Sequence, residues 1–160
     1  MLRLLAAVSF LLSALPASAQ EIVANDGYRT CPAEKTQEGL DVVRSACGTF
    51  NAPDFSGAYF GSLEALKEAE ALRDLFIGEV HDYGLCVTDF ITAQQQPGMP
   101  ADSHAPDQAA CAHAWAEDQL TETVREFGRA CIDFSNRSMM DARIAPWDGE
   151  CYPVVGSERG

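Results

Sequence analysis

Two long stretches of the chain carry largely hydrophobic residues at intervals of three and four positions. In residues 62–93 the series is Ala69, Leu72, Phe76, Val80, Tyr83, Val87 and Phe90. In residues 106–138 it is His113, Ala116, Leu120, Val124, Phe127, Cys131 and Phe134. Residues three and four apart share one face of an α-helix, so each stretch predicts a helix with one buried side.

Local signals support the ends of both predicted helices. Ser62 is a suitable N-cap for the first, and Pro106 suits the first turn of the second. The segment between them, residues 94–105, contains Gln94 to Gln96 and then Pro-Gly-Met-Pro, which ends a helix. A short connection between two long helices favours an antiparallel helical hairpin.

A third, shorter helix is predicted at residues 33–47. Leu40, Val43 and Cys47 recur at helical spacing, and Gly48 is a natural stop. Gly39 opposes the helix, at a cost of about 1 kcal/mol relative to alanine. The expected fold is therefore all-α, a disulfide-stapled helical bundle built on the hairpin, with an irregular tail at residues 139–160.

The first nineteen residues have the pattern of a secretory signal peptide. Arg3 precedes an apolar run from Leu4 to Leu15, and Ala17-Ser18-Ala19 is typical of a cleavage site. This run is shorter than the roughly twenty residues that a membrane-spanning helix needs. We expect residues 20–160 to form a single exported, soluble domain, in the periplasm or outside the cell, with no membrane span.

All six cysteines lie after the predicted signal peptide, which favours three disulfides in an oxidising compartment. A straight helix at residues 32–47 would be about 24 Å long and would exclude a Cys31–Cys47 bond. If Cys86 faces Cys111, residues whose numbers sum to 197 share one level of the hairpin. The pairs expected from this register are Cys86–Cys111, Cys47–Cys131 and Cys31–Cys151, although the last four cysteines allow three pairings.

The chain has a formal net charge of −13, which becomes −14 when Arg3 leaves with the signal peptide. Such a surface repels nucleic acid and anionic lipid headgroups, and it attracts basic proteins. The favoured interpretation of this charge is solubility in a salty environment. The alternative is that it attracts a basic protein partner or cations.

One weak metal site emerges on the two long helices. His113 and Glu117 lie one helical turn apart, and the register brings His81 and Glu79 near them. The Glu-x-x-His signature of bundle metal centres is missing from both helices. The simpler interpretation places His113 over Gly84, and we expect neither a metal nor another cofactor.

An aromatic group flanks the hairpin. Phe55, Tyr59 and Phe60 lie before the first long helix, and Trp147 lies in the tail. These side chains are candidates for a partner-binding surface, since exposed aromatic residues are frequent hot spots. The interpretation we favour is that they close the base of the bundle, because large aromatic side chains are usually buried.

No stretch of the sequence carries a recognisable catalytic motif. Asp102, Ser103 and His104 have the residue types of a hydrolase triad, but they are adjacent in a loop and lack a nucleophile elbow. The sequence therefore favours an exported non-enzymatic interaction module that binds a protein partner. The alternatives are a metal-binding or enzymatic bundle around His113 and Glu117, and a structural or stress-protective envelope protein.

Overall fold

The computed structural model describes residues 31–100 and 103–153. This part of the chain forms three helices and no strand: α1 (Ala33–Cys47), α2 (Leu63–Gln94) and α3 (Ala105–Met140). The predicted all-α fold is confirmed, and each helix ends within two residues of its predicted bounds. The predicted signal peptide at residues 1–19 lies outside the described residues.

The helix ends follow from local chemistry. The Ser62 hydroxyl accepts a hydrogen bond from the Ala65 N–H at 3.2 Å and so caps α2. A proline in the first turn begins α3, where a missing N–H costs nothing. At the end of α1, Gly48 has φ +71°, a left-handed conformation that glycine adopts without strain.

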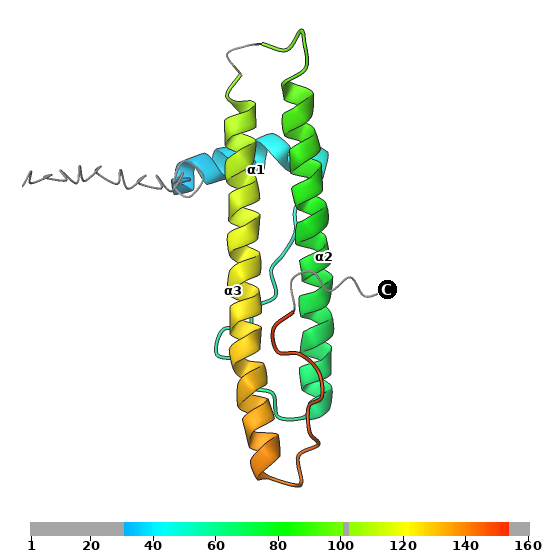
Figure 1. Ribbon diagram of the computed structural model, residues 1–160. Coiled ribbons are helices and arrows are strands. Elements are labelled where there is room, and N and C mark those ends of the chain that lie inside the picture. Colours follow the sequence, from blue (N-terminus) through cyan, green and yellow to red (C-terminus); the bar gives the residue numbers. More distant parts are fainter. Residues whose placement is uncertain (1–30, 101–102, 154–160) are drawn as a thin grey trace, which may run out of the picture.

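α2 and α3 lie side by side and run in opposite directions (Figure 1). At the end of the hairpin near residues 95–104, here called the tip, late α2 packs on early α3. The buried residues of this tip cluster are Phe76, Val80, Tyr83, Val87, Ala109, Ala112 and Ala116, joined by Val43 of α1. At the other end, the base, early α2 packs on late α3. The base cluster consists of Leu66, Ala69, Phe127, Ala130, Cys131 and Phe134, joined by Phe55 and Phe60.

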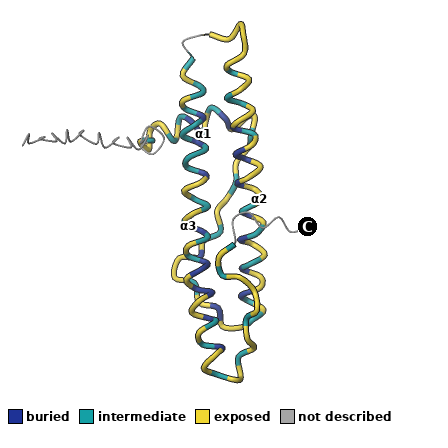
Figure 2. The backbone as a smooth tube through the Cα atoms, viewed as in Figure 1, coloured by how far each residue is buried: buried dark blue, intermediate teal, exposed yellow. Residues whose placement is uncertain are grey.

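Burial follows the inner sides of the two long helices, and the loop at the tip is exposed (Figure 2). One predicted member of the α2 stripe is wrong: Leu72 is 53% exposed, and the neighbouring Arg73 is buried in its place. The other members of the predicted stripe are buried or half-buried, so the difference is confined to this one position. In the described part of the chain, no helix is long and apolar enough to span a membrane.

α1 crosses the hairpin near its tip (Figure 1). Gly39 marks the crossing point with α3: a Cβ atom there would lie only 2.0 Å from the Gln108 carbonyl oxygen. The glycine that weakens α1 as an isolated helix therefore permits its backbone to approach α3. Next to the crossing, the Gln108 side-chain amide donates a hydrogen bond to the Glu38 carboxylate at 2.9 Å.

All six cysteines are paired, as predicted, but the expected partners are wrong. The disulfides are Cys31–Cys111, Cys47–Cys86 and Cys131–Cys151. The expected Cys86–Cys111, Cys47–Cys131 and Cys31–Cys151 bonds do not form. Cys86 and Cys111 lie at the same level of the hairpin, as expected, but they do not bond to each other. Cys111 of α3 bonds to Cys31 just before α1, and Cys86 of α2 bonds to Cys47 at the end of α1. With Cys47 and Cys86 joined, Cys131 is left to bond to the tail.

Candidate functional site

The four residues of the predicted metal site are not brought together. His113 lies against Gly84, where a Cβ atom would be 2.8 Å from His113 Nε2. His81 is exposed and lies 3.5 Å from Asp82, while Glu79 and Glu117 are also exposed. Among the described residues, no group of three or more histidines, cysteines or acids is placed to hold a metal ion.

Phe55 and Phe60 close the base of the bundle, which confirms the favoured interpretation of these two residues over a partner-binding surface. Both side chains are buried in the base cluster, with ring centroids 5.5 Å and 5.8 Å from that of Phe127. They close the base of the hairpin because burial of large aromatic rings against α3 is favourable. They therefore cannot form an exposed docking surface.

The other two aromatic candidates, Tyr59 and Trp147, are less buried than Phe55 and Phe60. Tyr59 is 68% exposed, and its hydroxyl accepts a hydrogen bond from Arg137 at 2.8 Å. The Arg137 guanidinium also lies over the Tyr59 ring, 4.1 Å from its centroid. Trp147 is half-buried against the base cluster, and its indole N–H is buried without a hydrogen-bond partner. Trp147 thus belongs mainly to the packing of the tail.

Arg73 is a buried charge that the sequence analysis missed. Its guanidinium is 1% exposed, lies 4.4 Å from the Phe127 ring centroid, and pairs with Asp74 at 2.7 Å. It also donates hydrogen bonds to the carbonyl oxygens of Glu150 and Cys151. These contacts fasten the tail to α2, and the Cys131–Cys151 bond fastens it to α3. The available signal was an arginine spaced four residues after Ala69 and three before Phe76.

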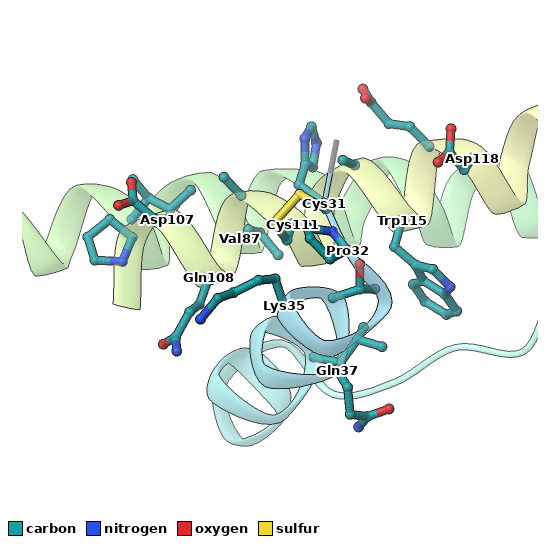
Figure 3. A pocket seen from close by; sticks show the side chains of 18 of the residues that line it. Cys31, Pro32, Lys35, Gln37, Val87, Asp107, Gln108, Cys111, Trp115 and Asp118 are labelled. Atoms are coloured by element: carbon teal, nitrogen blue, oxygen red, sulfur yellow. A yellow bond between two sulfur atoms is a disulfide. The ribbon is translucent and has the colours of Figure 1, made fainter. Parts of the chain in front are cut away.

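A groove of about 1500 Å³ lies at the tip, between the first part of α1 and the hairpin. Figure 3 shows the Cys31–Cys111 disulfide near its middle, with Asp107 and Gln108 on one side and Trp115 and Asp118 on the other. Its apolar lining is Leu40, Val87, Ile91 and Trp115. Its charged lining is Asp107, Glu117 and Asp118, together with Lys35, which is paired with Glu38. The groove therefore combines carboxylates with apolar surface.

Packing holds the Trp115 indole in place. The Phe50 ring stacks on it with centroids 5.2 Å apart and also contacts Phe76 and Tyr83, at 5.6 Å and 5.0 Å. Burial in this group raises the pKa of the Tyr83 hydroxyl. Because Phe50 lies just after α1, the linker and the tip cluster together set the position of this groove residue.

Charge is segregated along the hairpin. Residues 74–124 contain nine aspartates and glutamates and no lysine or arginine, whereas Lys67, Arg73, Arg125, Arg129 and Arg137 lie toward the base. The two basic residues of α1 bond to acids of the same helix: Lys35 to Glu38 at 2.9 Å and Arg44 to Asp41 at 2.7 Å. Folding α2 against α3 therefore gives the part of the hairpin nearer the tip a negative charge, to which Asp107, Glu117 and Asp118 of the groove belong.

Three segments that are distant in sequence form the groove: the first part of α1, the last part of α2 and the first part of α3. No protein-family model, curated protein or solved structure matches this chain. The chemistry that the groove offers, an acidic and partly apolar surface beside a fixed indole, is thus the basis for a functional proposal.

Proposed function

We propose that this protein is an exported, non-enzymatic interaction module whose tip groove binds a basic segment of a partner protein. The observation that carries the proposal is the charge of residues 74–124, nine acids without a lysine or arginine, of which Asp107, Glu117 and Asp118 line the groove. Complementary potentials steer charged partners together and select among them. A partner segment whose lysine or arginine side chains are not already paired with acids therefore complements this end of the molecule best.

The lining of the groove narrows the chemistry of the partner segment. Trp115 offers a flat indole face, which attracts lysine and arginine side chains as well as apolar ones. Leu40, Val87 and Ile91 add apolar surface beside the carboxylates. A segment that alternates basic and apolar side chains fits both features, because each kind of side chain has a matching surface.

The disulfides bear on where such binding takes place. Three intramolecular disulfides fit an oxidising compartment outside the cytosol. We place the protein in the periplasm or outside the cell, after removal of the signal peptide predicted at residues 1–19. A structural or stress-protective role remains the alternative, and it predicts no selective binding at the tip.

A labelled peptide tests the proposal directly. The probe is a ten-residue peptide of alternating lysine and leucine, and its counterpart has glutamate in place of lysine. The variant Asp107→Asn/Asp118→Asn removes two charges from the groove and should weaken binding of the lysine peptide about tenfold, equivalent to about 1.4 kcal/mol. Fluorescence anisotropy measures both dissociation constants.

A matched control separates the groove from the overall charge. Glu64→Gln/Glu68→Gln removes two exposed charges at the base, and Glu64, like Asp107, lies in the first turn of its helix. This control should change the affinity less than about threefold, because its charges lie well beyond the screening length of about 8 Å. Equal weakening by both variants, or no binding of the lysine peptide, would refute a specific site at the tip.

A further inference from the structure

α1 is the shortest of the three helices, and disulfides tie down both of its ends. Only Gly39 and Val43 are buried among its fifteen residues. A helix of this length is marginal in water without tertiary contacts. Cys31–Cys111 joins its beginning to α3, and Cys47–Cys86 joins its end to α2. These two bonds hold the ends of a helix whose middle packs on the hairpin through Gly39, Leu40 and Val43.

The three disulfides differ in access to solvent. Cys151 and the four cysteines that hold α1 are all partly exposed, whereas Cys131 is 0% exposed and lies in the base cluster with Phe127 and Phe134. Reduction requires a thiolate to attack one sulfur while the other leaves as a thiolate. At Cys131–Cys151, attack on Cys131 is blocked, and attack on Cys151 would leave a thiolate in an apolar site that disfavours charge.

We propose that α1 is a redox-releasable wall of the tip groove. A dithiol reductant opens Cys31–Cys111 and Cys47–Cys86 while Cys131–Cys151 stays closed. Each opening consumes one dithiol, which becomes a disulfide, and returns two cysteine thiols. α1 then leaves the hairpin, and the part of the groove lined by residues 31–40 disappears with it. The effect on partner binding rests on the function proposed above; the release of α1 does not.

The order of reduction tests the first step on the unaltered protein. Dithiothreitol treatment, quenching with iodoacetamide and peptide mass mapping give the rate at which each cysteine becomes labelled. The four cysteines of Cys31–Cys111 and Cys47–Cys86 should become labelled at least about tenfold faster than Cys131 and Cys151. Equal rates, or earlier labelling of Cys151, would overturn the proposal.

Hydrogen exchange tests the second step. After partial reduction and alkylation, amides of α1 should lose protection while those of α2 and α3 keep it. Loss of protection in all three helices together would mean that the fold opens as a whole, and it would refute a releasable wall. The control is the variant Cys131→Ser/Cys151→Ser without reduction, which keeps Cys31–Cys111 and Cys47–Cys86 and should therefore retain protection in α1.

The lysine–leucine peptide then connects the release of α1 to binding. Partly reduced protein should bind this probe at least about tenfold more weakly than oxidised protein. If the oxidised protein binds no peptide, the proposed function fails. The order of reduction and the hydrogen exchange of α1 still test whether α1 is released. If α1 is released and the affinity is unchanged, α1 is not a functional wall of the groove, and the proposal is overturned.

Discussion

His113 of α3 lies directly over Gly84 of α2, and a Cβ atom on residue 84 would approach its Nε2 atom to 2.8 Å. Alanine at 84 should gain about 1 kcal/mol of helix propensity and lose a similar amount by displacing the imidazole. Gly84→Ala should therefore leave the free energy of unfolding within about 1 kcal/mol of the wild type. In a His113→Ala background the same change should stabilise the protein. Urea denaturation measures both, and an equal gain in the two backgrounds would show that the contact has no energetic effect.

Gly39 should be the least replaceable glycine of the three helices. A Cβ atom there would lie 2.0 Å from the Gln108 carbonyl oxygen, and backbone cannot move aside as a side chain can. We expect Gly39→Ala to reduce the free energy of unfolding by more than about 2 kcal/mol despite its better helix propensity. Thermal denaturation followed by circular dichroism checks this, and a stabilising effect would contradict the close crossing of α1 and α3.

Gly78 provides the opposite case on α2. It is exposed, and nothing lies within 4 Å of the position that a Cβ atom would take. Gly78→Ala should stabilise the protein by about 0.5–1 kcal/mol, because alanine loses less backbone entropy in a helix. The same denaturation experiment measures it. A destabilised variant would mean that the exposed side of α2 makes contacts beyond those described.

Arg73 should be required for docking of the tail. Arg73→Ala removes the partner of Asp74 and two hydrogen bonds to tail carbonyls, and it leaves a cavity beside Phe127. We expect a loss of about 2–4 kcal/mol in unfolding free energy, together with faster hydrogen exchange at residues 148–153. Arg129→Ala is the control, since this residue is exposed on α3, and it should change stability by less than about 0.5 kcal/mol.

Glu38 should make the attachment of α1 dependent on pH. Hydrogen bonds from Lys35 and Gln108 lower the pKa of its carboxyl below the ordinary value of 4.5. A group whose pKa falls on folding stabilises the protein above its unfolded pKa, and this contribution disappears as the pH drops through the folded pKa. The stability difference between wild type and Glu38→Gln should therefore shrink between pH 5 and pH 3. Urea titrations across this range measure it, and a difference independent of pH would contradict the ionised contact.

The candidate site was only partly accessible from the sequence. The acidic charge, the exclusion of a Cys31–Cys47 bond and the position of His113 over Gly84 followed from counting and from helix geometry. The groove did not, because its walls come from α1 and from both arms of the hairpin, and no periodicity specifies how α1 crosses them. Phe55 and Phe60 were ambiguous for a related reason: aromatic residues in a linker serve a binding surface or, more often, a core, and only the packing decides between them.

Helical periods, caps and turn residues act within a few positions of one another, so the sequence alone determined three helices and nearly all of their ends. The partners of the cysteines depend on contacts between segments that are 20 to 80 residues apart. Cys86 and Cys111 share a level on neighbouring helices, yet each bonds to a different end of α1. Only the tertiary structure decided this, because the crossing of α1 at Gly39 places its two ends over different helices, and a disulfide forms where Cα atoms come within about 7 Å.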